Sequence, residues 1–206
     1  MDEHDSLVFL VDDDQSFRRS CERLLSIAGY RVESFPSGQE FLERGPPDSP
    51  ACLVTDLRMP GNGFDLQRVM ANAGWEIPVI FVTGHGDVPS SVRAMKAGAI
   101  QFLTKPFQER ELLTAVAEAI QLDRARRHGV AERAALRARY NSLTPRQRQV
   151  MKRVIAGMLN KQIAAELNIG EKTVKFHRAH IMEKMVAGSL AALVKMALDL
   201  GVNTKI

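Results

Sequence analysis

Carboxylates, hydroxyls and one ammonium group follow short apolar segments in the first half of the chain. These polar residues are Asp12, Asp13, Asp14, Asp56, Thr83, Thr104 and Lys105. Clustered carboxylates repel one another, and the pKa of each is raised unless a cation lies among them. Mg²⁺ is the divalent ion that best fits one or two carboxylates plus water. A lysine and a threonine opposite that ion would complete a site for a phosphoryl group, whose oxygens need cationic and hydrogen-bonding partners.

Alternating strand and helix patterns would bring these side chains together. The predicted strands are residues 7–11, 31–35, 52–55, 79–82 and 100–103, and the predicted helices are residues 15–28, 37–44, 64–73, 87–97 and 108–127. Such a series of strand–helix units predicts an α/β fold with a doubly wound, parallel sheet. These sheets place ligand chemistry beyond the carboxyl ends of their strands, so the polar residues should converge on one crevice. Each residue also has an ordinary structural role, and Asp14 is predicted to cap a helix.

The last third of the chain has the pattern of short helices, one of them with a basic face. Thr144 caps the first helix, a second runs from Asn160 to a left-handed residue at Asn168, and a third follows Glu171. The third helix has a buried stripe at helical spacing, formed by Val174, His177, Ile181 and Met185. Within it, His177 is expected to be a hydrogen-bonded core residue. Two short helices joined by a tight turn predict a helix-turn-helix whose second helix enters the DNA major groove.

Specific DNA contacts are predicted from this placement. On the exposed side of the third helix, Lys175 is placed to read guanine edges and Phe176 to contact a thymine methyl group. Phosphate contacts are expected near helix starts and flanks, from Thr144, Lys161, Thr173 and Lys184. Lys172 and Arg178 complete the predicted DNA-binding set. A last helix over residues 189–200 has an apolar face that we expect to be shared between the core and a second subunit.

The composition is that of an ordinary folded protein. Of the 206 residues, 45% are hydrophobic and 25% are charged, which excludes a disordered or collagen-like chain. No run of about 18 apolar residues predicts a membrane span, and the acidic N-terminus is unlike a secretory signal. Cys21 and Cys52 lack the spacing of a disulfide or zinc framework, so we expect reduced thiols and a cytoplasmic protein.

Charge divides the chain into two parts. Residues 1–121 carry 11 basic and 18 acidic residues, a net charge of −7, whereas residues 122–206 carry 17 and 6, a net charge of +11. We expect an acidic domain joined to a basic domain that lies near nucleic acid, with chance segregation of surface charge as the alternative. The start of the basic part is rich in alanine and arginine, which favours a semi-rigid helical linker. Its arginines are Arg124, Arg126, Arg127, Arg133, Arg137 and Arg139. We expect them either to form a solvated helix face or to contact DNA directly.

Motifs at the predicted strand ends resemble the receiver domain of two-component response regulators over nearly all of residues 7–121. They are Val11-Asp12-Asp13-Asp14, Thr55-Asp56-Leu57-Arg58-Met59-Pro60, Val82-Thr83-Gly84 and Leu103-Thr104-Lys105-Pro106-Phe107. The resemblance implies a flavodoxin-like sheet with strand order 2-1-3-4-5, and a phosphoacceptor, Asp56, that attacks the phosphohistidine of a sensor histidine kinase. It also implies a Mg²⁺ ion, with Mn²⁺ as the alternative. Asp13, Asp56 and the Arg58 carbonyl would bind the ion directly, and Asp12 would act through water.

The receiver resemblance assigns further roles. Lys105 pairs with the acceptor carboxylate and then with the phosphoryl group, while Thr83 follows that group as a switch and Phe102 occupies the aromatic switch position. The Lys105–Pro106 peptide bond is expected to be cis, which is feasible only before proline. The chain departs from the family in the stretch from Asp56 to Gly63, which is one residue shorter than the usual loop.

Motifs in the last part resemble the LuxR/NarL-type DNA-binding domain over about residues 139–203. They are Leu143-Thr144-Pro145-Arg146, Asn160-Lys161-Gln162-Ile163-Ala164 and Lys172-Thr173-Val174-Lys175-Phe176-His177. With the segment from Thr83 to Pro89, the whole chain resembles the FixJ/StyR branch of response regulators. The expected domains are a receiver over residues 1–121, an arginine-rich helical linker over 122–138 and an all-α four-helix helix-turn-helix domain over 139–206. Ala179 departs from the pattern, because many relatives carry a lysine or arginine there.

The combined resemblance implies a phosphorylation-dependent transcriptional regulator, not a metabolic enzyme. Phosphorylation would pair two receivers through helix 87–97, strand 100–103 and helix 108–120, placing two recognition helices on double-stranded promoter DNA. RNA polymerase is a further partner that the resemblance allows, and a constitutive dimer through the linker helix is the alternative assembly. Other function classes are a Mg²⁺-dependent aspartyl-phosphate phosphatase, whose acceptor motif would follow the first strand, and a phosphate-independent scaffold. The complete set of acidic, hydroxyl and ammonium groups argues against the scaffold.

Overall fold

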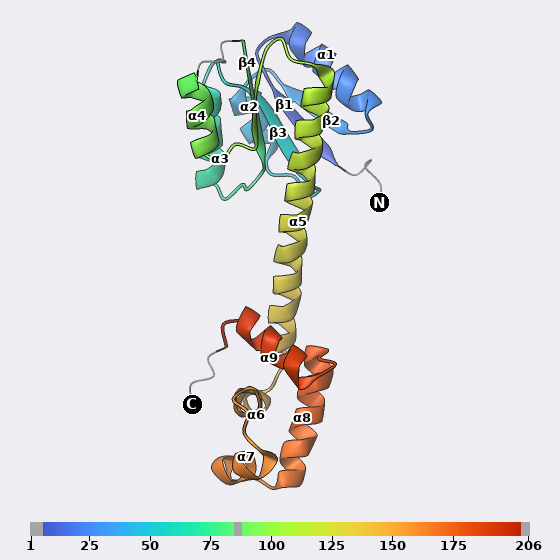
Figure 1. The fold of residues 1–206 in the computed structure, drawn as a ribbon, viewed down its shortest axis with the longest axis vertical. Helices are drawn as coiled ribbons and strands as arrows, with labels where there is room; N and C mark the ends of the chain where they lie inside the picture. Colours follow the sequence, from blue (N-terminus) through green and yellow to red (C-terminus); the bar gives the residue numbers. More distant parts are fainter. Residues whose placement is uncertain (1–5, 85–87, 203–206) are drawn as a thin grey trace. The chain divides into compact units, whose positions relative to one another are not determined.

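A parallel sheet forms the centre of the first of two compact units, Met1–Arg127 and His128–Ile206. The computed structural model of the chain describes residues 6–84 and 88–202. The strands are β1 (Leu7–Val11), β2 (Arg31–Phe35), β3 (Ala51–Asp56), β4 (Val79–Thr83) and β5 (Gln101–Thr104). Their order, β2-β1-β3-β4-β5, and their parallel pairing confirm the predicted fold class (Figure 1). Each predicted strand boundary differs from the observed one by at most one residue.

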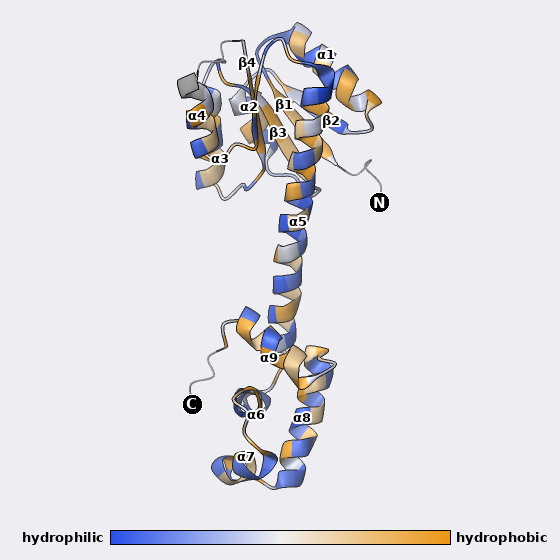
Figure 2. Ribbon diagram, in the orientation of Figure 1, coloured by the Kyte–Doolittle hydropathy of each residue, from blue (hydrophilic) through white to orange (hydrophobic). Residues whose placement is uncertain are grey.

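Helices cover both faces of this sheet. They are α1 (Gln15–Ile27), α2 (Gly38–Arg44), α3 (Gly63–Asn72), α4 (Val88–Lys96) and α5 (Glu109–Asn141). Cys21 and Leu25 of α1 share one core with Val116 of α5, whereas Phe41 of α2 and Met70 of α3 belong to the core on the other face. Strands β1, β3 and β4 are buried along their whole length, as expected for a parallel sheet with two covered faces. Their hydrophobic residues stand out in Figure 2.

Helix α5 continues from the helix predicted over residues 108–127 into the segment predicted as a helical linker. It continues without a break for 33 residues, so its first part belongs to the first unit and its remainder to the second. The division between the units, after Arg127, falls inside the segment predicted as a linker. Among the residues that the structure describes, no helix has both the length and the apolarity needed to cross a bilayer.

Asp123 anchors the first part of α5 to the rest of the first unit. Its carboxylate is fully buried, and it accepts hydrogen bonds from the Ala51 N–H at 2.9 Å and from the guanidinium groups of Arg126 and Arg127 at 2.6 and 2.7 Å. Arg124 donates to the Ser6 hydroxyl at 2.6 Å. The interpretation of these three arginines as a solvated face or as DNA contacts is therefore wrong, because their guanidinium groups bind the first unit.

The second unit is helical. It comprises α6 (Pro145–Ile155), α7 (Asn160–Leu167), α8 (Glu171–Met185) and α9 (Leu190–Asp199), together with the end of α5, from which Leu136 and Tyr140 pack against its core. Thr144 caps α6 through the Gln147 N–H, and Gln147 returns a hydrogen bond to the Thr144 N–H. Asn168 adopts the predicted left-handed conformation with φ of 51°. These signals set the boundaries of α6 and α7 as the sequence predicts.

Both cysteines are free and buried in the core between the sheet and the α1–α5 face. Cys21 lies on α1 and Cys52 on β3, where it is completely inaccessible to solvent. Burial raises the pKa of the Cys21 thiol to about 12 and also raises that of Cys52. Both side chains are therefore protonated thiols at neutral pH.

Candidate functional site

Three carboxylates meet at the carboxyl ends of β1 and β3. These strands pair in parallel with Val11 opposite Thr55, so Asp12 and Asp56 follow at the same edge of the sheet. One carboxylate oxygen each from Asp12, Asp13 and Asp56 lies within 4.8 Å of the others. Asp12 and Asp56 are buried, whereas Asp13 is exposed. Hard oxygen donors at this spacing fit a Mg²⁺ ion that keeps several water ligands.

Lys105 bridges the two buried carboxylates. Its Nζ lies 2.6 Å from Asp12 Oδ2 and 2.8 Å from Asp56 Oδ2. Burial raises the pKa of Asp12, although hydrogen bonds from Lys105 and the Asp14 N–H oppose that shift. Burial also lowers the pKa of Lys105, but its hydrogen bonds to both carboxylates outweigh this effect, so its pKa stands above the ordinary value. The lysine is therefore a fixed cation, and the raised pKa of Asp12 indicates that the cluster favours additional positive charge.

The short loop after Asp56 packs closely against this residue and the start of α3. The Arg58 N–H donates to Asp56 Oδ1 at 2.7 Å, and the Leu57 N–H donates to the Val82 carbonyl at 3.0 Å. Gly63 begins α3 in direct contact with this loop, since a Cβ atom there would lie only 2.6 Å from the Asp56 carbonyl oxygen. The sequence analysis named Gly63 only as the end of the stretch after Asp56 and did not predict this close contact. The geometry of the loop after Asp56 depends on the absence of a side chain at this position.

The predicted switch residues lie on β4 and β5, on the same side of Asp56 as Lys105. Thr83 is fully buried at the end of β4, opposite Thr104 of β5, and its carbonyl accepts a hydrogen bond from the Lys105 N–H at 2.8 Å. Phe102 is half-buried and packs against the core that contains Phe81, its partner in the strand register. The Lys105–Pro106 peptide bond is cis. The structure therefore joins Thr83 and Lys105 through the backbone.

An open groove of about 470 Å³ adjoins Lys105 on the side of α1. It is lined by Phe17, Ser20, Cys21, Leu24, Lys105, Pro106, Phe107 and Glu109. The rings of Phe17 and Phe107 meet edge to face with their centroids 5.9 Å apart. This surface is mainly apolar and lies beside the Lys105 ammonium group.

The exposed side of α8 carries most of the predicted DNA-binding residues. Lys172, Thr173, Lys175 and Phe176 are all exposed, as is Lys161 at the start of α7. Phe176 is 59% exposed, and its ring lies over that of His180 with a centroid distance of 4.1 Å. A large exposed aromatic group among lysines suits contact with stacked bases and phosphates.

Other predicted DNA contacts also have partners within the second unit. Arg178 donates to Asn160 Oδ1 at 2.9 Å and so joins α8 to the start of α7. Lys184 donates to the Ser142 carbonyl at 2.9 Å, and the exposed Thr144 hydroxyl caps α6. His177 is half-buried, and its Nδ1 has no hydrogen-bond partner among the described residues. The prediction of a hydrogen-bonded His177 is therefore wrong for that nitrogen.

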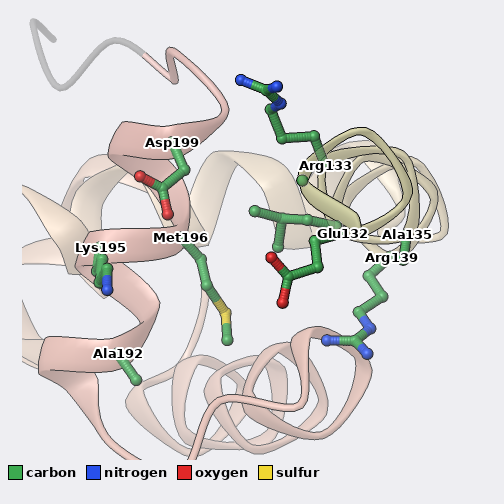
Figure 3. Close-up of a pocket in the computed structure, with 10 residues that line it drawn as sticks. Glu132, Arg133, Ala135, Arg139, Ala192, Lys195, Met196 and Asp199 are labelled. Carbon is green, nitrogen blue, oxygen red and sulfur yellow. The ribbon is translucent and has the colours of Figure 1, made fainter. Parts of the chain in front are cut away.

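A second groove, of about 720 Å³, lies between the end of α5 and α9, within the second unit. Figure 3 shows Met196 between charged side chains of the two helices, among them Glu132, Arg133 and Asp199. Arg139 and Lys195 complete the charged lining. Because acidic and basic groups alternate around it, this groove lacks the single-sign lining of a phosphate or metal site.

Comparison with known proteins matches both units. Residues 8–117 match the response regulator receiver domain, and residues 141–197 match the luxR family of bacterial regulatory proteins. Nodulation protein W of Bradyrhizobium diazoefficiens is 48% identical over 199 residues, which cover 96% of this chain and 88% of that protein. Response regulator protein TmoT of Ectopseudomonas mendocina is 43% identical over 197 residues, covering 95% of this chain and 90% of that protein.

Solved structures agree with these matches. The response regulator StyR superimposes with a TM-score of 0.88 at 47% identity, covering 94% of this chain and 98% of that one. Full-length FixJ from B. japonicum has a TM-score of 0.57 at 40% identity, covering 96% and 98%. The strand order, the carboxylate cluster and the helix-turn-helix accord with this kinship. The chain belongs to the two-component response regulators that join a receiver domain to a LuxR-type DNA-binding domain, and it is a transcription regulator rather than a metabolic enzyme.

Proposed function

We propose that a sensor histidine kinase phosphorylates this regulator on Asp56 in the presence of Mg²⁺, and that the phosphorylated form dimerises and binds promoter DNA. The observation that carries the proposal is the acceptor geometry. Asp56 is a buried carboxylate at a strand end, 2.8 Å from the ammonium group of Lys105 and within 4.8 Å of two further carboxylates. A nucleophile, a fixed cation and a metal-ligand set are the components that phosphoryl transfer needs.

In the proposed reaction, an Asp56 oxygen attacks phosphorus and forms a P–O bond while the N–P bond of the phosphohistidine breaks. The bonding electron pair leaves with the imidazole nitrogen, which takes up a proton. Lys105 stabilises the charge on the phosphoryl oxygens. Asp12, Asp13, Asp56 and the Arg58 carbonyl would hold Mg²⁺, which offsets the repulsion between carboxylates and a phosphate dianion. The groove beside Lys105 offers an apolar surface to the phosphodonor protein.

Dimerisation is proposed through α4, β5 and α5. When Asp56 carries a phosphoryl group, Thr83 would move toward it and Phe102 would fill the space released, which changes this surface. Two apolar side chains of α4 favour a contact, since Val92 is 46% and Met95 50% exposed. Asp87, at the start of the predicted helix 87–97, lies outside the described residues.

DNA binding is proposed through α8. Lys175 and Phe176 would contact base edges, while Lys161, Lys172 and Thr173 would contact phosphates. Arg178 and Lys184 would reach phosphates as well as their partners within the domain, and Thr144 would do so beside its cap. The net charge of +7 over residues 143–206, from 11 basic and 4 acidic residues, supports a polyanionic partner.

The test of the acceptor is intact-mass measurement after incubation of the full chain with acetyl phosphate and Mg²⁺. We expect the wild-type chain to gain one phosphoryl group and Asp56→Asn to gain none. Asp65→Asn is the matched control, because Asp65 is an exposed carboxylate on α3 paired with Arg68, and it should behave as wild type. Chelation of the metal should stop the reaction. A phosphoryl group retained by Asp56→Asn would contradict the assignment.

A further inference from the structure

The ammonium group of Lys105 has a third partner besides the two carboxylates. Its Nζ lies 3.7 Å from the centroid of the Phe17 ring, over the ring face. An ammonium group has three N–H donors. Two of these N–H groups donate to Asp12 Oδ2 and Asp56 Oδ2. The ammonium group also faces the electron-rich face of the Phe17 ring, which attracts a cation. The site therefore surrounds the cation with two charges and one aromatic face.

Phe17 is itself held in place by the segment that carries the carboxylates. Its backbone N–H donates to the capping carboxylate of Asp14 at 3.2 Å. The next residue, Arg18, donates to the backbone carbonyl of Asp12. The Phe17 ring also meets Phe107, two residues after Lys105, edge to face. The first turn of α1 thus connects the metal-ligand loop and the lysine loop through one aromatic side chain.

The position of the ring decides where Lys105 can go. Phe17 and Lys105 both line the groove of about 470 Å³ along α1, so the Lys105 side chain has open space beside it as well as the two carboxylates. A lysine side chain has high rotamer entropy, and a hydrated ammonium is stable in an open groove. Without the ring face, the cation would divide its time between the carboxylates and the solvent in that groove.

We propose that Phe17 is a positioning residue for phosphoryl transfer: its aromatic face holds the Lys105 ammonium at the acceptor carboxylates and away from the groove. This inference rests on the proposed function of Asp56 as phosphoacceptor. Phe17 touches neither the phosphoryl group nor the metal in this role and acts only through Lys105. The property required at position 17 is a π face, not merely apolar volume.

The experiment compares Phe17→Leu with Phe17→Tyr in the full chain. Leucine keeps an apolar side chain without a π face, and tyrosine keeps the face. With acetyl phosphate and Mg²⁺, we expect Phe17→Leu to lower the rate of Asp56 phosphorylation at saturating donor about fivefold, the size of one partly shielded cation–π contact. Phe17→Tyr should restore a rate within about twofold of wild type. The half-saturating donor concentration should change less than the rate. Urea unfolding of both variants shows whether they are folded.

A spectroscopic measurement tests the contact without any reaction. Protons above an aromatic face are shielded, so the Lys105 Hε signals should lie upfield of the other lysines in the wild-type chain and in Phe17→Tyr. They should return to the ordinary position in Phe17→Leu. Equal rates and unchanged Lys105 signals in Phe17→Leu would overturn the proposal. An equal loss of rate in both variants would also overturn it, because groove shape and not the π face would then be the cause. A wild-type chain that takes up no phosphoryl group would defeat the proposed function, while the Lys105 signals would still decide whether Phe17 holds the ammonium.

Discussion

At the residue scale, the loop after Asp56 requires glycine at position 63, because a side chain there would contact the backbone of Asp56. A Cβ atom there would lie 2.6 Å from the Asp56 carbonyl oxygen, which is part of the backbone, and 3.0 Å from the ring of Phe81, which is fully buried. We expect Gly63→Ala to destabilise the chain by about 1–3 kcal/mol and to slow phosphorylation of Asp56 markedly. Urea unfolding and the acetyl-phosphate reaction measure the two effects.

Gly61 provides the matched control for Gly63. It belongs to the same loop, with φ of +91° and no atom within 4 Å of an added Cβ. Gly61→Ala should therefore cost only backbone strain, about 1 kcal/mol, and leave the acceptor in place. If Gly61→Ala slowed phosphorylation as much as Gly63→Ala, general loop strain and not contact with Asp56 would be the cause.

Lys175 and Lys161 should have different roles in DNA recognition: Lys175 should contact base edges, and Lys161 should bind phosphates. Lys175→Ala should weaken binding to a selected specific duplex by about 1–3 kcal/mol with little effect on random DNA. Lys161→Ala should weaken all duplexes similarly and reduce the salt slope by about one. Titrations of both variants at several salt concentrations measure these effects. Equal loss of discrimination in the two variants would contradict the division of roles.

The chemistry-bearing residues could be predicted from the sequence because each follows an apolar run that ends at the same sheet edge. Asp12, Asp56 and Lys105 needed only the direction of the strands to be brought together. Phe17 could not be identified in this way, because its role depends on the side-chain conformation of Lys105. The prediction that His177 is hydrogen-bonded was wrong for Nδ1. Helical spacing shows that a residue lies on a buried stripe, but it does not show whether its side chain has a hydrogen-bond partner.

At the scale of elements, a buried carboxylate as well as apolar packing holds the first part of α5 against the rest of the first unit. Asp123 is fully buried, whereas its partners Arg126 and Arg127 are about one-third exposed or less. We expect Asp123→Asn to destabilise the first unit by about 2 kcal/mol, because two guanidinium groups lose their shared counter-ion. Amide exchange of Ala51, whose N–H donates to Asp123, should quicken.

Glu76→Gln is the control for Asp123. Glu76 pairs with Arg126 at 2.7 Å but is 66% exposed, so the pair is screened by solvent. Its loss should cost less than about 1 kcal/mol and leave the Ala51 exchange rate unchanged. If the two substitutions had similar effects on stability and on Ala51 exchange, surface charge and not the buried carboxylate would be what holds α5 in place.

The boundaries of strands and helices could be predicted wherever a short sequence pattern, such as an apolar run or a helix cap, determines them. The short apolar and β-branched runs predicted each strand to within one residue, and the caps at Thr144 and Asn168 set the ends of their helices. The anchoring of α5 was not predictable. Aspartate three and four residues before arginine is also the pattern of a solvated helix face, and only the tertiary fold shows that Asp123 meets the Ala51 amide.

At the scale of the whole molecule, phosphorylation is expected to control assembly. Sedimentation at low micromolar concentration should show a monomer without phosphoryl mimic and a dimer with beryllium fluoride bound at Asp56. The dimer should also show a steeper salt dependence of DNA binding, because it doubles the phosphate contacts. Asp56→Asn should remain monomeric under both conditions. A dimer of equal affinity in both states would favour constitutive association through the linker helix.

The two cysteines should make stability depend on alkaline pH. Their thiol pKa values are raised in the folded chain, to about 12 for Cys21, and an unfolded thiol titrates near 8.5. The stabilising contribution is therefore complete below about pH 8.5 and falls as pH rises above it, because only the unfolded chain releases the proton. Urea unfolding of wild type and of a Cys21→Ala, Cys52→Ala variant at pH 7 and 10 measures the difference. Equal pH dependence in both proteins would contradict this account.

The burial of these thiols also bears on how the regulator responds to oxidative stress. Peroxides and electrophiles react with thiolates, and accessible thiolates are nearly absent when both sulfurs are protonated and enclosed. Sulfenylation or glutathionylation would first require the sheet and α1 to separate. Chemical modification of either thiol is therefore expected to depend on local unfolding of the first unit, and the folded regulator should be insensitive to thiol oxidants.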